Sequence, residues 1–349
     1  MDKKPKIFHY ITSLNIGGTE RFLQDVIKET SRDYEHEVGY IKVLGKIGKE
    51  LLESGVSVRK LDSIRKIYKH LKEIKPDLIH THLYRANIMG RFAGKLAGIP
   101  VVSSQRSIDL WKNKLYILMD RFTAGWCNKV IANSHYACRI IENREKIPVE
   151  KIELIYTGLD SNWYVDDAEF RKTNNIGFVG RLHPHKGADL LCDFARDLKQ
   201  SYPEISIKIV GEGPLENEMK EDLSSNAEIV GRVEGEELKR FYDNIDLILI
   251  LSREESFPRV ILEAASRGVP AVSADVGGIS EFISEGETGY LFPPQDIKEA
   301  VKKLNDYFNK DDISKKIIAE NVLNKSRQFS KEYMIEKMIK VYEEQLQSK

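Results

Sequence analysis

The stretch LILSREESFPRVILEAASRGVPAVSADVGG, residues 249–278, decides the fold of this chain. It begins within an apolar run that closes at Leu251 and predicts a buried strand, and Pro258 then opens a helix with apolar periodicity. Gly268 and Pro270 end that helix before a second short strand. The order strand, loop, helix, strand is typical of a parallel α/β sheet.

Two glutamates in this stretch are candidate ligand-binding groups. Glu255 falls in the loop before the helix and Glu263 in its second turn, so both are expected near the carboxyl edge of the sheet, where open α/β folds bind ligands. Their carboxylates could accept hydrogen bonds from the hydroxyl groups of a sugar-bearing ligand. For either residue alone, a solvated acid at a helix end is the simpler interpretation, so the rest of the chain must decide.

The same alternation of strands and helices fills both halves of the chain. In the first half, strands are expected at residues 6–11, 36–43, 56–61, 77–82, 100–104 and 129–134, and helices at 19–30, 47–54, 62–74, 84–97, 110–124 and 135–145. In the second half, strands are expected at 175–180, 205–210, 227–231, 245–251, 270–274 and 290–292, and helices at 188–201, after Pro214, at 235–243, after Pro258, and at 279–284, 296–309, 312–326 and 331–347. This pattern predicts an α/β fold with two Rossmann-like, doubly wound parallel-sheet domains facing each other across a cleft.

An irregular segment separates the two halves. Residues 150–164 show no clear periodicity, and a new strand begins at Asn175. We expect an N-terminal domain at 1–165, a C-terminal domain at 166–328, and a terminal helix at 329–349.

Composition indicates a globular protein outside the secretory route. The 349 residues are 41% hydrophobic and 31% charged, and no run approaches the roughly 18 to 20 apolar residues that span a bilayer. The first residues lack the apolar core of a signal peptide, and the three cysteines are widely spaced, as expected for reduced thiols. We expect a cytoplasmic location.

The net charge of zero hides an asymmetry. Residues 1–165 hold 28 Lys and Arg against 19 Asp and Glu, whereas the remainder holds 26 against 35. A basic half suits an anionic partner. Nucleic acid is not expected, because the basic residues are not interleaved with aromatic side chains that could stack on bases.

Cations and glycines at two strand ends suit a phosphate-bearing ligand. The segment GFVGRLHPHKG places Arg181 and Lys186 in a loop after a strand, where they could neutralise a diphosphate. Gly17 and Gly18 precede a helix whose free N–H groups favour an anion. Solvated loop cations and a simple turn are the alternatives.

Other chemistries are poorly supported by the sequence. No Asp-x-Asp pair is present to hold a divalent ion against a diphosphate, so neither a metal nor another cofactor is expected. His80 and His82 share one side of a strand but lack an evident third ligand, and we expect them in the cleft wall. Gly211 and Gly213 begin a dinucleotide fingerprint that is not completed, and no G-x-S-x-G elbow occurs.

An ordered series of motifs resembles one enzyme family. These are GFVGRLHPHKG, IVGEGPL, IVGRV, EESFPRVILEAASRGVPAVSADVGGISEFI and GETGYLFPPQD between residues 177 and 296, and IGGTERF and the DLIHTH to AGIPVV segment earlier. Their order and spacing, including the Glu255 to Glu263 separation, resemble glycosyltransferase family 4. That resemblance implies the GT-B fold, a nucleotide-sugar donor and retention of anomeric configuration.

The resemblance also implies roles for individual residues. Glu263 would bind ribose hydroxyls and Glu255 the transferred sugar, while Arg181 and Lys186 would stabilise the diphosphate as it leaves. The donor would also contact the backbone at Arg232 and Val233 and the glycine pairs Gly17, Gly18 and Gly277, Gly278. The assignment of Glu255 rather than Glu254 follows from spacing, and the terminal helix would pack on the first domain.

One position departs from the family pattern. Many relatives carry a histidine near the donor sugar after the strand that corresponds to PVVSS, whereas this chain continues Gln105-Arg106-Ser107. Gln105 or Arg106 would replace it, or His82 would take over part of its role, and these alternatives stay open.

The first half carries a basic segment beside an apolar one. The cations are Arg59, Lys60, Arg65, Lys66, Lys69, Lys72 and Lys75, and the apolar residues are Leu110, Trp111, Leu115, Tyr116, Leu118, Met119 and Phe122. Together they suit peripheral contact with an anionic membrane, at the inner face of the cell membrane. A solvated helix beside an ordinary core is the alternative.

The leading hypothesis is a retaining glycosyltransferase. It would move a hexose or N-acetylhexosamine from a nucleoside diphosphate sugar, preferably a UDP-sugar, to a hydroxyl of a lipid-linked saccharide in surface polysaccharide synthesis. The alternatives are a nucleotide-sugar epimerase or hydrolase and a non-catalytic nucleotide-sugar-binding subunit. The oligomeric state stays open.

Overall fold

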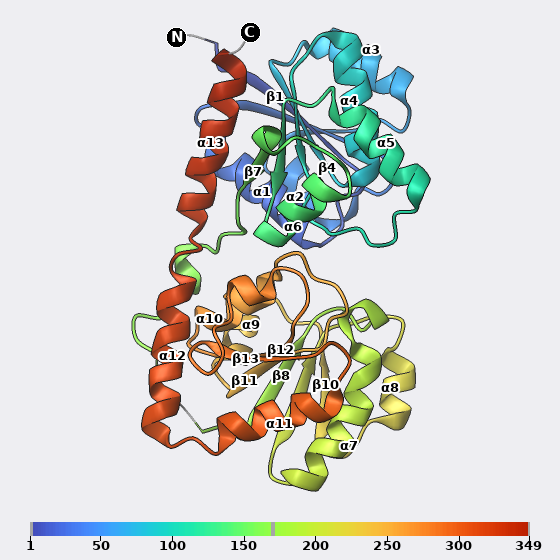
Figure 1. Ribbon diagram of the computed structural model, residues 1–349. Helices are drawn as coiled ribbons and strands as arrows, with labels where there is room; N and C mark the ends of the chain where they lie inside the picture. Colours follow the sequence, from blue (N-terminus) through green and yellow to red (C-terminus); the bar gives the residue numbers. More distant parts are fainter. Residues whose placement is uncertain (1–2, 169–171, 348–349) are drawn as a thin grey trace. The chain divides into compact units, whose positions relative to one another are not determined.

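The chain forms two compact units, shown in a computed structural model that describes residues 3–168 and 172–347 (Figure 1). The first unit comprises Met1–Thr157 and Glu332–Lys349, and the second comprises Gly158–Lys331. The first unit thus ends at Thr157, whereas the sequence predicted a domain boundary at residue 165. The reason is local pairing: the Leu159 amide donates to the Phe329 carbonyl, and the Lys331 amide donates to the Leu159 carbonyl.

The first unit is built on a seven-stranded sheet in the order β3-β2-β1-β4-β5-β6-β7, with every neighbouring pair parallel. The strands are β1 Lys6–Ile11, β2 Glu35–Tyr40, β3 Ser57–Lys60, β4 Leu78–His82, β5 Val101–Ser104, β6 Lys129–Ala132 and β7 Ile152–Leu154. The edge strand β7 lies in the segment that the sequence left irregular. The other six strands lie where alternation predicted them.

Helices cover both faces of this sheet. They are α1 Gly18–Thr30, α2 Gly45–Glu53, α3 Ile64–Ile74, α4 Tyr84–Ala97, α5 Lys114–Ala124, α6 His135–Asn143 and α13 Lys331–Gln347, with a 3-10 turn η1 at Val149–Lys151. Phe8 and Tyr10 of β1 pack in a core with residues of α3, α4 and α6, whereas Ile7 packs with α1 and α13. The alternating side chains of β1 therefore serve both layers.

Helix α13 supplies a large part of one core of the first unit. Met334, Met338 and Tyr342 are buried and pack with Ile7 and Phe22. The Tyr342 hydroxyl also lies 2.6 Å from His80 Nδ1. The end of the chain is thus integral to the first unit (Figure 1).

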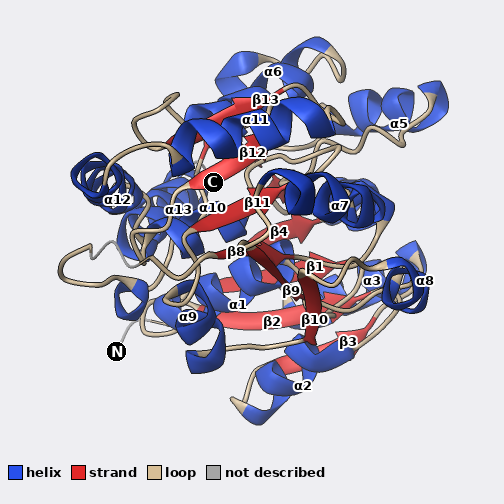
Figure 2. Cartoon of the chain, turned by 90° about the horizontal axis from the view of Figure 1, so that it is seen from below, coloured by secondary structure: helices blue, strands red, loops and turns tan. Residues whose placement is uncertain are grey.

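The second unit holds a six-stranded sheet in the order β10-β9-β8-β11-β12-β13, again with parallel neighbours (Figure 2). The strands are β8 Asn175–Val179, β9 Ser206–Val210, β10 Ala227–Gly231, β11 Leu247–Ile250, β12 Ala271–Ala274 and β13 Gly289–Phe292. The helices are α7 Leu191–Ser201, α8 Glu216–Asp222, α9 Glu236–Tyr242, α10 Arg259–Ala265, α11 Ile297–Phe308 and α12 Asp312–Ser326, with 3-10 turns η2 Ser161–Trp163, η3 Pro184–Lys186, η4 Ala188–Leu190 and η5 Ile279–Glu281.

Both sheets show the doubly wound order in which the chain starts in the middle and reverses direction. Helices α7 and α11 contact each other, and α10 contacts α9 and α12, so helices flank this sheet as well. The predicted α/β fold with two Rossmann-like parallel-sheet domains is confirmed. Within the described residues, none of the helices combines the length and the apolar character needed to cross a bilayer.

Candidate functional site

The loops at the carboxyl edge of the second sheet are bound tightly to one another. The loop after β8 donates from the Leu182 amide to the Glu212 carbonyl, which lies after β9, and the Arg253 amide after β11 donates to the His185 carbonyl. Gly187 has φ +70°, and a Cβ at this position would lie 2.1 Å from the Leu251 carbonyl oxygen. Only glycine fits there. The two backbone hydrogen bonds and the close approach at Gly187 therefore hold the loops after β8, β9 and β11 together.

Lys186 and Glu255 meet at this edge. The Lys186 Nζ donates to Glu255 Oε1 at 2.5 Å, and the Ser252 hydroxyl donates to the same oxygen at 2.7 Å. Glu255 is only 9% exposed. Its other oxygen, Oε2, accepts no hydrogen bond from the described part of the chain and thus keeps its capacity for a ligand hydroxyl.

The geometry also separates the two adjacent glutamates. Glu255 is buried and paired with Lys186, whereas Glu254 is partly exposed. Arg181 is exposed in the same loop as Lys186 and forms no ion pair within residues 3–168 and 172–347. Both cations of the loop after β8 are therefore accessible to an anionic ligand.

Glu263 lies on the buried face of α10. The Tyr242 hydroxyl donates to its Oε2 at 3.1 Å and the Arg259 Nε donates to its Oε1 at 3.0 Å. Burial, followed by the Glu263 charge, raises the pKa of Tyr242 well above its ordinary value, so this phenol stays a donor. Each oxygen of Glu263 keeps a further lone pair, which allows the carboxylate to accept from a diol.

Two further segments of the second unit lie where the sequence predicted. Gly277 has φ +63°, and the Gly278 amide donates to the Ser256 carbonyl next to Glu255. Arg232 and Val233 follow β10 at the same edge, with the Arg232 guanidinium paired to Glu234. The sheet topology thus brings the predicted donor-binding residues of this unit to one edge.

Gly17 and Gly18 lie at the start of α1 in the first unit. Gly17 is the N-cap, and the Glu20 carboxylate folds back over it: a Cβ on Gly17 would lie 2.5 Å from Glu20 Oε2. Burial raises the pKa of Glu20. An anion approaching this helix end meets a carboxyl group there, whereas the space beside Gly18 is open.

The histidines of β4 lie in the interior, so their predicted place in a cleft wall is wrong. His80 and His82 are fully buried, and His9 of β1 joins them as the third imidazole that the sequence did not reveal. Burial, the largest cause, holds the pKa values of all three well below the ordinary value. His9 Nδ1 lies 3.3 Å from His82 Nε2, and His9 Nε2 lies 3.0 Å from His36 Nδ1. Both ring nitrogens of His9 therefore serve as hydrogen-bond partners within this chain of histidines.

Gln105 and Arg106 are both engaged within the first unit. The Gln105 amide donates to Glu145 at 2.7 Å, and the side chain is 3% exposed. Arg106 donates to the Ile155 carbonyl and to Thr157, and its guanidinium lies 3.9 Å from the centre of the Phe22 ring. Both side chains therefore fix the loop after β5, although the buried Gln105 Oε1 has no hydrogen-bond partner among the described residues.

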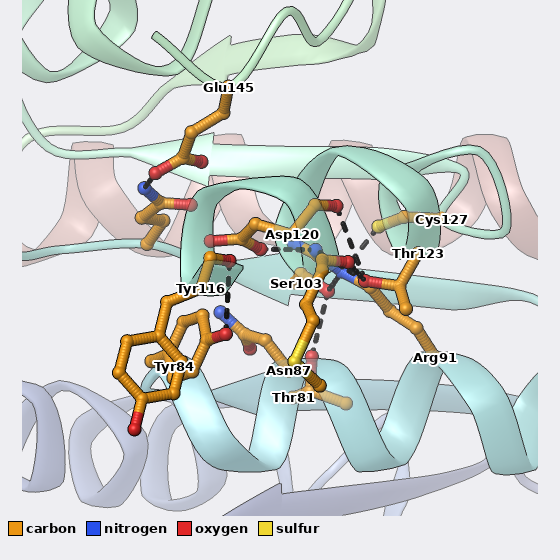
Figure 3. A network of polar contacts seen from close by, with 12 residues as sticks. Thr81, Tyr84, Asn87, Arg91, Ser103, Tyr116, Asp120, Thr123, Cys127 and Glu145 are labelled. Carbon is orange, nitrogen blue, oxygen red and sulfur yellow. Dashed lines mark hydrogen bonds and ion pairs between the residues drawn. The ribbon is translucent and has the colours of Figure 1, made fainter. Parts of the chain in front are cut away.

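Arg91, Lys112, Asp120 and Glu145 are buried in the first unit, and we define them as the buried ion cluster. Figure 3 labels Arg91, Asp120 and Glu145 of this cluster. The Arg91 guanidinium donates to Asp120 at 2.7 Å, and Lys112 donates to Asp120 at 2.7 Å and to Glu145 at 3.0 Å. Burial alone would lower the pKa of Lys112, but Asp120 and Glu145 outweigh it and raise the pKa. The cluster ties α4, α5 and the loop after β5 together.

Helix α5 consequently buries a largely polar face and exposes its apolar face. Its buried residues are Asp120, Thr123 and Ala124, whereas Leu115, Leu118 and Phe122 are 62%, 59% and 67% exposed. The alternative that this segment forms an ordinary core is therefore wrong for Leu115, Leu118 and Phe122, because these side chains are exposed. The sequence could not show this, since an amphipathic helix does not reveal which face is buried.

Comparisons with known proteins identify the family of this chain. Residues 16–163 match the model of Glycosyltransferase Family 4, and residues 164–324 match that of Glycosyl transferases group 1. A GDP-mannose-dependent alpha-mannosyltransferase of Corynebacterium glutamicum is 27% identical over 79% of this chain and 70% of its own. A UDP-Gal:alpha-D-GlcNAc-diphosphoundecaprenol alpha-1,3-galactosyltransferase of Escherichia coli is 25% identical over 71% and 70%.

The fold has a clear counterpart among solved structures. The Anabaena protein Alr3699/HepE, solved in complex with UDP, superposes with a TM-score of 0.85 over 97% of this chain and 100% of its own, at 22% identity. Two family models that adjoin at residue 163 and a matching two-domain fold lead to one conclusion. The chain belongs to the GT-B glycosyltransferases of the family 4 type.

Proposed function

We propose that this protein is a retaining, metal-independent glycosyltransferase that moves a hexose or N-acetylhexosamine from a UDP-sugar to a hydroxyl of a lipid-linked saccharide. The observation that carries the proposal is the Lys186–Glu255 contact, which sets a cation and a carboxylate with one unused oxygen side by side at the carboxyl edge of the second sheet. UDP in the Anabaena structure and the lipid-linked acceptor in the name of the Escherichia coli relative support the choice of substrates.

The residues divide the donor between them. Glu263 accepts from the ribose hydroxyls, and Glu255 Oε2 accepts from a hydroxyl of the transferred sugar. Arg181 and Lys186 neutralise the diphosphate, with the backbone at Arg232 and Gly278 bordering the ligand.

In the chemical step, the bond between the anomeric carbon and the diphosphate oxygen breaks while the acceptor oxygen bonds to that carbon from the same face. The acceptor hydroxyl proton passes to the departing diphosphate, so no protein base is required. Negative charge grows on the diphosphate as the bond breaks, and the positions of Arg181 and Lys186 suit its stabilisation.

A panel of donors tests this function. UDP- and GDP-sugars are incubated in excess chelator with polyprenyl-diphosphate-linked N-acetylglucosamine, and the release of nucleoside diphosphate and the glycosylated product are both measured. We expect release and transfer from a UDP-sugar, unaffected by chelator. Conversion of the donor without any acceptor would instead indicate an epimerase or hydrolase, and a requirement for a divalent cation would contradict metal independence.

We further propose that the first unit contacts an anionic membrane. Helix α3 presents Arg65, Lys66, Lys69 and Lys72, and α5 in the same layer presents its apolar face. Cations beside exposed apolar side chains suit the headgroup region of a bilayer. The protein is expected to sediment with phosphatidylglycerol vesicles at low salt and not with phosphatidylcholine vesicles; failure to sediment with either would contradict the contact.

A further inference from the structure

A largely apolar pocket lies at the carboxyl edge of the first sheet, apart from the residues assigned above. Its volume is about 710 Å³. Its walls come from the loops after β1, β2, β4 and β5, from the first residue of α3 and from the first two turns of α4 and α5. Open α/β sheets bind ligands at this edge. The pocket therefore has the position and the size of a ligand site.

Three aromatic side chains form one wall of the pocket. Tyr84, Trp111 and Tyr116 meet edge to face, with ring centres 5.4 to 5.6 Å apart. The Tyr84 hydroxyl donates to the Tyr116 carbonyl at 3.0 Å, which fixes the cluster. Trp111 is nevertheless 56% exposed and Met119, beside it in the lining, is 40% exposed. An ordered apolar wall left open to solvent is the mark of a binding surface.

Two cations stand at the same pocket. Lys42 and Arg85 are exposed, and neither forms an ion pair within the described residues. Asp109 is the acidic residue of the lining, and it is already occupied by Lys112 at 3.2 Å and by the Ser107 hydroxyl at 2.6 Å. The pocket thus joins an apolar wall to an unneutralised positive charge, which suits an amphipathic anion.

The apolar surface continues beyond the pocket along α5. Tyr116 and Met119 belong both to the pocket and to this helix, and Leu115, Leu118 and Phe122 extend the exposed face. The buried ion cluster holds the helix in this orientation through Asp120 (Figure 3). A hydrocarbon chain can therefore leave the pocket along a rigid apolar track.

We infer that this pocket binds the lipid-proximal part of the acceptor, with a phosphate or diphosphate on Lys42 and Arg85 and the first segment of the hydrocarbon chain on the Tyr84, Trp111 and Tyr116 rings. This inference rests on the proposed transfer to a lipid-linked saccharide. It names the acceptor class as a lipid with a phosphate or diphosphate on a single hydrocarbon chain, as distinct from a diacyl phospholipid, and assigns the residues that select it.

Binding of farnesyl diphosphate to the full chain tests the inference. Equilibrium dialysis of labelled farnesyl diphosphate is performed with saturating UDP. The UDP fills the proposed nucleotide site of the second unit, so that farnesyl diphosphate cannot bind there. We expect it to bind at least about tenfold tighter than farnesol or inorganic diphosphate, since each probe lacks one half of the recognised ligand. Binding no tighter than either probe would overturn the inference.

Matched variants assign the binding to this pocket. Trp111→Ala should weaken farnesyl diphosphate severalfold, and the double change Lys42→Ala, Arg85→Ala should remove its advantage over farnesol. The control Lys49→Ala, Leu52→Ala alters an exposed cation and an exposed leucine on α2 and should change nothing. Equal affinities in all three variants would contradict the assignment.

Two further measurements distinguish failure of the acceptor pocket from failure of the proposed function. Dihexanoyl phosphatidylglycerol should compete poorly, and competition equal to that of farnesyl diphosphate would show a site for bulk phospholipid and refute an acceptor site. UDP binding is titrated in separate, UDP-free samples of the same protein preparation. Normal UDP binding without farnesyl diphosphate binding overturns the pocket alone, whereas absent UDP binding in the unaltered protein counts against the proposed function.

Discussion

Two lysine–glutamate contacts in this molecule share their chemistry and differ in their surroundings. Lys112 and Glu145 lie in the interior of the first unit, where Lys112 and its carboxylate partners are almost fully buried. Lys186 and Glu255 lie at the edge of the second sheet, where the lysine side chain is 35% exposed and Glu255 Oε2 has no partner among the described residues. The first contact is shielded from solvent, and its lysine also pairs with Asp120 of helix α5. The second contact is accessible to solvent and can bind a ligand.

The difference teaches that residue types alone do not identify a site. Removing one partner of a buried pair leaves an uncompensated charge in the interior, so its main cost falls on stability. A half-exposed pair contributes little to stability, so its substitution acts mainly on the ligand. The following changes separate these two effects.

The largest effect is expected for Lys112→Met. Asp120 and Glu145 would lose the buried lysine that bridges them and would keep only Arg91 and Arg144, respectively. This loss of a buried partner should lower the free energy of unfolding by about 3–5 kcal/mol. Urea unfolding followed by circular dichroism measures it. Lys114→Met, two residues away on the exposed side, is the control. Equal stability of the two variants would show that the buried cluster does not anchor α5.

The next effect is expected for Lys186→Ala and Glu255→Ala. Each should reduce turnover at least about a hundredfold, the scale of losing one group that stabilises the transition state. Thermal unfolding should change little. Glu254→Ala is the matched control and should retain most activity. Near-normal turnover in both Lys186→Ala and Glu255→Ala would overturn the site assignment.

A smaller effect concerns the histidine chain of the first unit. Burial lowers the pKa of His36 to about 4, so between pH 6.5 and 4 the unfolded chain binds a proton that the folded chain does not. Stability should therefore fall as the pH falls through this window. His36→Gln should reduce the slope by up to about 1.4 kcal/mol per pH unit.

Urea unfolding at several pH values measures this slope. The unaltered protein, unfolded at the same pH values, is the reference. If His36→Gln has the same slope as the unaltered protein, His36 titrates normally and the histidine chain is not desolvated.

Most of the fold could be predicted from the sequence because apolar periodicity and glycine or proline breaks recur regularly. The missed strand β7 is only three residues long and lies at a sheet edge, so it carries almost no periodic signal. The position of the candidate donor-side residues at one edge of the second sheet could be predicted, because these residues follow successive strands in the sequence. Their role in binding the donor stays a prediction.

The polar interior of the first unit could not be predicted. Residues 9 and 36 are single histidines in otherwise ordinary strands, and only the pairing of β1 with β2 and β4 brings them to His82. Asp120 gave no signal of burial, because a charged residue on a helix is normally solvated. These contacts depend on tertiary packing, which spacing along the chain does not encode.

Titration of UDP by calorimetry, in excess chelator, tests the central claim most directly. The unaltered protein should bind UDP without a metal, and Glu263→Gln should weaken binding at least about tenfold, because a charged acceptor for the ribose hydroxyls is lost. Glu237→Gln, an exposed acid on α9, should bind UDP normally. Absence of UDP binding in the unaltered protein, or unchanged affinity in Glu263→Gln, would contradict a nucleotide site at the carboxyl edge of the second sheet.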